Sequence, residues 1–136
     1  MYYKEFGCLY DWETAKTVCP EGWHVSTVEE WTILTDYLGG NTLAGGKLKS
    51  LTVWKSPNRG ATNEIGFSGL PGGCRSHDGM FGDIGEFGSW LTSTENKQDG
   101  AYNRTVGFNG SDVYGDACYK KSGYSLRCMK DYKAIV

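Results

Sequence analysis

Glycine is the feature that most constrains the fold of this chain. The sequence has 136 residues, of which 20 are glycines, about twice the usual share of ~7%. Nine of them divide residues 58–88 every few positions: Gly60, Gly66, Gly69, Gly72, Gly73, Gly79, Gly82, Gly85 and Gly88. Glycine favours turns and weakens the interiors of helices and strands. Residues 58–88 are therefore predicted to form a long, irregular loop region.

Two amphipathic helices are predicted ahead of this loop region. The first spans residues 11–19 and is stopped by Pro20, and its apolar residues recur at helical spacing: Trp12, Ala15, Val18 and Cys19. The second opens at a capping box, Ser26-Thr27-Val28-Glu29, and ends at Gly39-Gly40, where glycine favours a left-handed cap. Its predicted apolar face consists of Val28, Trp31, Leu34 and Leu38.

Short strands are predicted on both sides of the loop region. Residues 22–25 form one strand between the two helices, and a short further helix is predicted within residues 44–51. After the loop region, β-type patterns occur at residues 89–94, 101–108, 112–114 and 124–129. Two N-terminal helices, a long loop region and an antiparallel sheet indicate the α+β class. The length predicts a single domain over residues 1–136.

Charge and hydropathy exclude two classes of partner. The net charge is −2, so the chain lacks the clustered cations that nucleic-acid phosphates require. No stretch approaches the ~20 consecutive apolar residues of a membrane span. The opening residues, MYYKEFGCLYDW, show no pattern of a secretory signal peptide. We therefore predict no nucleic-acid binding and no membrane insertion.

The cysteines do not form a metal-binding pattern. There are five of them, so at least one thiol stays unpaired within the chain: Cys8, Cys19, Cys74, Cys118 and Cys128. No two have the C-x2-C spacing of a zinc site, and His24 and His77 are isolated from them. No metal site is predicted, and the redox compartment stays open.

No established catalytic motif occurs in the sequence, and no catalytic residue is predicted. Neither His24 nor His77 has an evident partner in the sequence. Arg75 would lower the pKa of the adjacent Cys74 thiol, although a cysteine in a glycine-rich loop is more often only a small residue.

Acidic residues in and beside the loop region raise the question of calcium, which binds six or more oxygens. None of them falls in a recognisable calcium-loop spacing. No cofactor is predicted, and a structural calcium remains the alternative, with these carboxylates as the candidates: Glu64, Asp78, Asp83, Glu86 and Glu95.

Five blocks of sequence carry a family resemblance. These are GCLYDWETAKTVCPEGWHVSTVEEWTILTDYLGG, AGGKLKS, GATNEIGFSGLPGGCR, FGSWLTSTE and GYSLRCMKD. Together, over residues 7–131, they closely resemble the Fibrobacter succinogenes major paralogous domain, a family widespread in Bacteroidetes and their relatives. The layout is also similar to the C-type lectin fold, which implies a disulfide between Cys19 and Cys128. The calcium and sugar triplets of true lectins are missing, so calcium-dependent sugar binding is not implied.

C-type lectin folds are the usual scaffold of variable proteins that diversity-generating retroelements produce, and members of this family resemble such targets. Adenine mutagenesis would scatter Asn, Tyr, Ser, Asp and similar residues over one ligand-binding face. Lys120 and Lys121 fall outside such a set, and the alternative is an ordinary solvated strand and turn. The resemblance implies that the ligand-binding residues are Tyr102, Arg104, Asn109, Ser111, Asp112, Tyr114, Asp116, Ala117 and Tyr119.

Together, the sequence patterns and the family resemblance predict a non-enzymatic ligand-binding or adhesion module. Its partner would be a protein or glycan ligand on a cell surface, and its location extracellular, on a bacterial cell surface or on a virion. One alternative is an enzyme related to the formylglycine-generating enzymes, for which Cys74 and Cys118 are the only candidate thiols. Another alternative is a structural assembly module of a surface protein.

Overall fold

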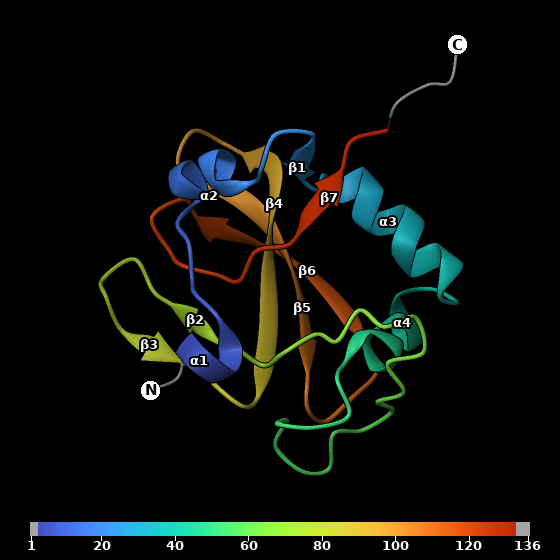
Figure 1. Ribbon diagram of the computed structural model, residues 1–136. Coiled ribbons are helices and arrows are strands. Elements are labelled where there is room, and N and C mark those ends of the chain that lie inside the picture. The colour runs from blue at the N-terminus through green and yellow to red at the C-terminus, as the bar shows by residue number, and fades with distance from the viewer. Residues whose placement is uncertain (1–2, 133–136) are drawn as a thin grey trace.

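The structure is a computed structural model that describes residues 3–132, so the first two and last four residues of the predicted domain lie outside the described residues. Four helices are present: α1 (Tyr3–Phe6), α2 (Trp12–Val18), α3 (Val28–Tyr37) and α4 (Asn41–Leu48). Seven strands accompany them (Figure 1): β1 (Trp23–Val25), β2 (Cys74–Arg75), β3 (Phe81–Gly82), β4 (Phe87–Asn96), β5 (Gly100–Gly107), β6 (Val113–Tyr119) and β7 (Cys128–Lys130). The mixture of helices and antiparallel sheets confirms the predicted α+β class.

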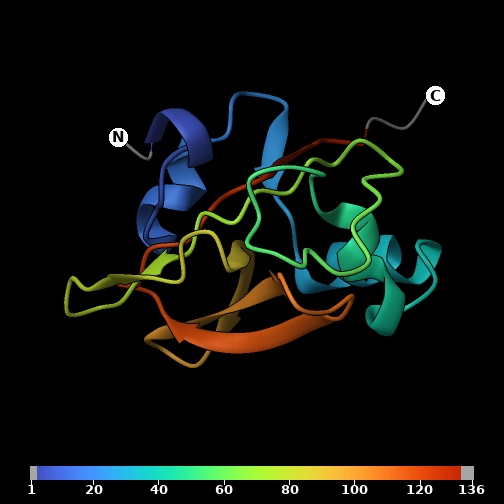
Figure 2. The same cartoon turned by 90° about the horizontal axis from the view of Figure 1, so that it is seen from below.

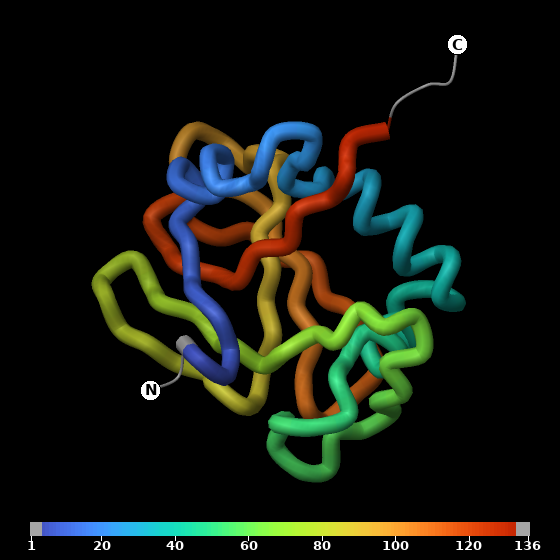
Figure 3. The backbone as a smooth tube through the Cα atoms, viewed as in Figure 1, coloured from blue at the N-terminus to red at the C-terminus, as the bar shows by residue number. Residues whose placement is uncertain are grey.

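The largest sheet is an antiparallel meander in the order β4-β5-β6, which leaves β6 at an edge. Two smaller antiparallel pairs, β1-β7 and β2-β3, complete the strands. Between α4 and β4 the backbone winds through a long irregular path whose only regular element is the β2–β3 hairpin (Figure 3). The glycine-rich region is therefore loop-dominated, as predicted.

Strand β4 of the meander packs against other elements on both of its faces, because neighbouring residues of a strand point to opposite sides. Trp90 of β4 packs in an aromatic cluster, 6.0 Å from Trp31 of α3 and 5.5 Å from Phe67 between ring centroids. Leu91, the next residue, packs instead with Trp12 of α2 and with Ala101. The Trp12 indole also donates a hydrogen bond to the Thr92 carbonyl at 3.0 Å, which fixes α2 against the second face.

Several element boundaries differ from the predictions. The capping box of α3 lies one residue later than predicted, because Thr27 is the N-cap and Glu30 is the reciprocal partner. The short helix, α4, begins at Asn41 directly after Gly40. Of the predicted strand at residues 124–129, only Cys128 and Met129 pair in a sheet, as part of β7 with β1, whereas Tyr124 and Ser125 make isolated bridges.

Strands β1 and β7 close the fold near its C-terminal end. Val25 is opposite Cys128 in this pair, and a disulfide joins Cys128 to Cys19, 109 residues earlier in the chain. This is the pair that the resemblance implies. The disulfide links the end of α2 to the last strand, so it encloses nearly all of the described fold.

The expectation that His24 has no partner is wrong. Its Nδ1 lies 2.6 Å from Oδ1 of Asp131, and its Nε2 lies 2.9 Å from Oε2 of Glu30. Hydrogen bonds to Glu30 and then to Asp131 raise the pKa of His24 above 6.5. The imidazole therefore connects the start of α3 to the segment that follows β7, and its protonated form can donate to both carboxylates.

This raised pKa predicts a pH-dependent stability. A histidine whose pKa is higher in the folded state adds stability that is fully present below its unfolded pKa and is lost as the pH rises through its folded pKa. His24→Gln is expected to lower the free energy of unfolding by about 0.5–1 kcal/mol at pH 6, a figure reduced for solvent exposure. Urea denaturation at pH 6 and pH 9 checks this; a difference between the two proteins that grows with pH would contradict it.

Candidate ligand-binding site

The nine predicted ligand-binding residues lie along β5, β6 and the turn between them. Figure 2 shows β6 along the outer side of the molecule, with no helix beyond it. Four consecutive residues of β6, from Tyr114 to Ala117, are exposed. The strand thus provides a surface that is directly accessible to a partner.

The strand alternation divides the predicted residues between two faces. In the register of β5 and β6, Tyr102 is opposite Ala117 and Arg104 is opposite Gly115, and these four residues share one face. Tyr114 and Asp116 point to the other face. The structure therefore brings Tyr102, Arg104 and Ala117 together but separates them from Tyr114 and Asp116.

Arg104 lies across its neighbour on β6. A Cβ atom at Gly115 would lie only 2.8 Å from Nη1 of Arg104, so glycine makes room for the guanidinium. Nη1 also donates to the Asn103 carbonyl at 2.9 Å. Partial burial lowers the pKa of Arg104, yet an arginine remains charged at neutral pH. A cation is thereby held flat against the outer strand.

The turn between β5 and β6 places Asn109, Ser111 and Asp112 at the far end from Tyr119. Asn109 is exposed, whereas Ser111 is packed against helix α4 and the loop region. The Gly45 amide donates to the Ser111 carbonyl at 2.8 Å, and a Cβ atom at Gly60 would collide with Ser111 Oγ at 2.0 Å. Ser111 therefore anchors the turn, and Asn109 is more available to a ligand.

A buried lysine fixes this turn, and nothing in the sequence pattern indicated it. Lys49 follows α4 and is fully buried, with 0% of its surface exposed. Its Nζ donates to the carbonyls of Arg59, Gly107 and Gly110 at 2.7, 2.9 and 3.0 Å. Three acceptors match the three N–H groups of an ammonium. Through these hydrogen bonds the ammonium joins the loop region to the β5–β6 turn. Burial lowers the pKa of Lys49 to about 8.

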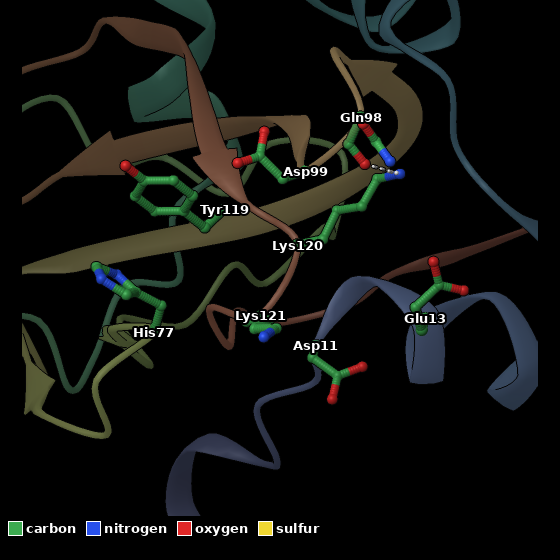
Figure 4. A pocket seen from close by; sticks show the side chains of 8 residues that line it. All are labelled: Asp11, Glu13, His77, Gln98, Asp99, Tyr119, Lys120 and Lys121. Atoms are coloured by element: carbon green, nitrogen blue, oxygen red, sulfur yellow. Dashed lines mark hydrogen bonds between the residues drawn. The ribbon is translucent and has the colours of Figure 1, made fainter.

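At the other end of β6 the surface is hollowed. Figure 4 shows this hollow, whose volume is about 640 Å³. The ring of His77 lies 4.6 Å from that of Tyr119, between centroids. Lys120 is held by Glu95 and the Gln98 carbonyl, each at 3.0 Å. The lining residues come from four separate segments: Asp11, Glu13, His77, Gln98, Asp99, Tyr119, Lys120 and Lys121.

Of these lining residues, only Tyr119 was among the predicted ligand-binding set. His77 and Asp11 reach the hollow from segments that are distant in the sequence, and only the tertiary fold brings them there. Two rings with carboxylates and ammonium groups around them can recognise a ligand by stacking and by charged hydrogen bonds.

The two candidate thiols are not activated. Burial, followed by the Asp83 carboxylate, raises the pKa of Cys74, whose Sγ donates to Oδ2 of Asp83 at 3.8 Å. The expectation that Arg75 lowers this pKa is therefore wrong. Burial likewise raises the pKa of Cys118 to about 11. Both thiols are protonated at neutral pH, and a protonated thiol is a poor nucleophile.

The carboxylates considered for calcium are engaged separately. Glu86 binds Lys55 at 2.8 Å and Glu95 binds Lys120 at 3.0 Å, whereas Asp83 accepts from Cys74. Within residues 3–132, no three His, Cys, Asp or Glu side chains gather as a metal would require. None of the helices in the same range is long and apolar enough to cross a membrane.

Fold and site together define an α+β domain whose candidate site is an exposed polar and aromatic surface on the edge strand β6. Residues 1–130 match the model of the Fibrobacter succinogenes major domain, so the chain belongs to that family. Comparisons with curated proteins and with solved structures give no match.

Proposed function

We propose that this chain is a non-enzymatic ligand-binding module of an extracellular, cell-surface or virion protein. The ligand is a protein or a glycan, and it binds along β6, from Arg104 to the hollow beside Tyr119. The observation that carries the proposal is the exposed run from Tyr114 to Ala117, which continues into the paired rings of Tyr119 and His77.

The composition of this surface supports a recognition role. Tyrosine gives broad, rigid contact at a low cost in side-chain entropy, and Asn, Ser and Gly add adaptable hydrogen bonds. Tyr114 and Tyr119 are 51% and 54% exposed, so both rings are available as anchors. The resemblance to C-type lectin folds supports the same role, with β5 and β6 as the variable part of a fixed scaffold.

The raised pKa values of Cys74 and Cys118 also favour binding over thiol catalysis. A formylglycine-generating type of reaction needs a reactive cysteine pair, and these thiols lie in surroundings that keep them protonated. The proposal therefore assigns no catalytic residue.

The ligand-binding surface can be tested with arrays of glycans and of bacterial surface proteins. Tyr119→Ala is expected to weaken the binding of a captured ligand by about tenfold, as for an exposed aromatic anchor. Tyr37→Ala is the matched control, because this tyrosine is 80% exposed on α3. Binding that both variants retain equally, or the absence of any captured ligand, would overturn the proposal.

Diversification by a retroelement has a separate, genomic test. We expect a near-identical DNA repeat beside the gene that differs at adenines within codons 102–119 and matches at codons 120 and 121. A repeat without this adenine bias, or a locus with no reverse transcriptase gene, would contradict diversification and leave the binding role standing.

A further inference from the structure

The backbone of β6 has one hydrogen-bonding edge that faces away from the sheet. The Tyr102 carbonyl accepts from the Thr92 hydroxyl at 2.7 Å, so Tyr102 directs its backbone groups toward β4. Ala117 is opposite Tyr102. In an antiparallel ladder such a pair exchanges no hydrogen bonds, and the outer residue points its N–H and C=O outward. Ala117, and by the same alternation Gly115, therefore direct their backbone groups away from the sheet.

This edge is open within residues 3–132. Within these residues the Ala117 amide donates to the carboxylate of the preceding Asp116, at 2.9 Å, and no backbone hydrogen bond joins Gly115 or Ala117 to a segment outside the sheet. Natural edge strands are commonly blocked by proline, lysine or a bulge. The sequence of β6, VYGDACY, has no proline and no lysine, and its pairing with β5 is unbroken.

Opposite charges lie on the two sides of this edge. The Arg104 guanidinium lies across Gly115 on one face, and Asp116 points to the other face. A residue that pairs with Gly115 from an added strand would place its side chain beside Arg104, because cross-strand partners share a face. The neighbouring residue, opposite Asp116, would point to the Asp116 side. Charge complementarity thus requires that the added strand carry an acidic residue opposite Gly115 and a basic residue opposite Asp116.

We propose that β6 binds an extended peptide segment of a partner protein as an added antiparallel strand. The segment carries a basic residue opposite Asp116, followed by an acidic residue opposite Gly115 and beside Arg104. Backbone hydrogen bonds to Gly115 and Ala117 hold it, as in other cases of strand addition. This inference rests on the proposed function, since it names the partner of the same surface.

A second copy of this chain fits the edge less well. Self-pairing that overlaps the whole of β6 is centred on Asp116 and sets two Asp116 carboxylates directly opposite each other. Like charges in that position destabilise a strand pair. The charges of the edge therefore favour a peptide with the basic-acidic order.

The test uses a blocked peptide, acetyl-Thr-Val-Thr-Lys-Glu-Thr-Val-Thr-amide, titrated into the whole chain and followed by NMR. Ala117→Pro removes the outward N–H while leaving the ladder to β5 intact, and Tyr37→Ala, on α3 and outside the sheet, is the control. We expect Ala117→Pro to weaken binding by about tenfold, as for the loss of one or two hydrogen bonds, and Tyr37→Ala to bind like the unmodified chain.

Two further arms keep the test independent of how Ala117→Pro folds. The same peptide with an N-methylated glutamate cannot pair through that amide and is expected to bind about tenfold more weakly. Peptides with Lys-Lys or Glu-Glu at the centre are expected to bind more weakly than the Lys-Glu peptide. Full binding by the N-methylated peptide, equal binding by all three charge versions, or no binding of the Lys-Glu peptide would overturn the inference.

Two outcomes separate this inference from its alternatives. If an array ligand is lost with Tyr119→Ala but retained with Ala117→Pro, strand addition is wrong and the binding role stands. If the unmodified chain is dimeric by light scattering and Ala117→Pro is monomeric, the edge pairs with a second copy, which also overturns the peptide inference.

Discussion

Lys49→Met is expected to lower the free energy of unfolding by about 3–4 kcal/mol, because it leaves the three carbonyl groups that bind this buried ammonium without their donor. Those carbonyls belong to Arg59, Gly107 and Gly110, and the lysine is fully buried among them. Methionine fills a similar volume, so the loss reports on the hydrogen bonds more than on packing. Urea denaturation at pH 7 measures the difference.

A matched control for this prediction is Lys55→Met. Lys55 is exposed and pairs with Glu86 at 2.8 Å, and a surface ion pair contributes at most about 1 kcal/mol. The pH dependence gives a second check. Because burial lowers the pKa of Lys49 to about 8, the folded protein releases the Lys49 proton at a lower pH than the unfolded chain does. The stability advantage over Lys49→Met should therefore widen between pH 8 and about 10; a gap that narrows would contradict the lowered pKa of Lys49.

Removal of the Cys19–Cys128 disulfide is expected to have an effect of similar size. The bond closes a loop with a sequence separation of 109 residues, and chain-entropy estimates for such loops give about 4–5 kcal/mol. The double variant Cys19→Ala and Cys128→Ala should therefore unfold at markedly lower urea concentration than the unmodified chain.

The control for the disulfide is Cys8→Ala, which removes an exposed, unpaired thiol and should change the stability by no more than about 0.5 kcal/mol. Intact-mass measurement before and after reduction provides an independent check. If the mass does not increase on reduction, or if the double variant is as stable as the unmodified chain, the bond does not hold the fold together.

The helices could be predicted from the sequence because helical periodicity is a local property. The positions of Trp12 and Trp31 on the apolar faces of α2 and α3 follow from it directly. The capping box was misplaced because Ser26 and Thr27 are both hydroxyl residues, and Glu29 and Glu30 both follow three positions later. Local pattern does not distinguish these pairs, and the packing of α3 does.

The β2–β3 hairpin and the surroundings of His77 and Lys49 could not be predicted, because they depend on contacts between segments that are distant in the sequence. The β2–β3 hairpin consists of two-residue strands, and Arg75 is paired by Gly123, 48 positions later (123 − 75). His77 becomes part of the site only because this hairpin brings it to Tyr119. Lys49 would be placed on the surface by its charge alone. Its burial is stabilised by carbonyls from three positions that no local pattern connects.

The anchoring of the β5–β6 turn by main-chain groups determines how mutations should act there. Lys49 binds the carbonyls of Gly107 and Gly110, and Gly45 binds the carbonyl of Ser111. Every amino acid supplies a carbonyl, so these anchors do not depend on which side chain stands at the exposed position Asn109. Tolerance to substitution is thus concentrated where the turn meets solvent, while the residues that hold it in place, in α4 and directly after it, have little freedom to change.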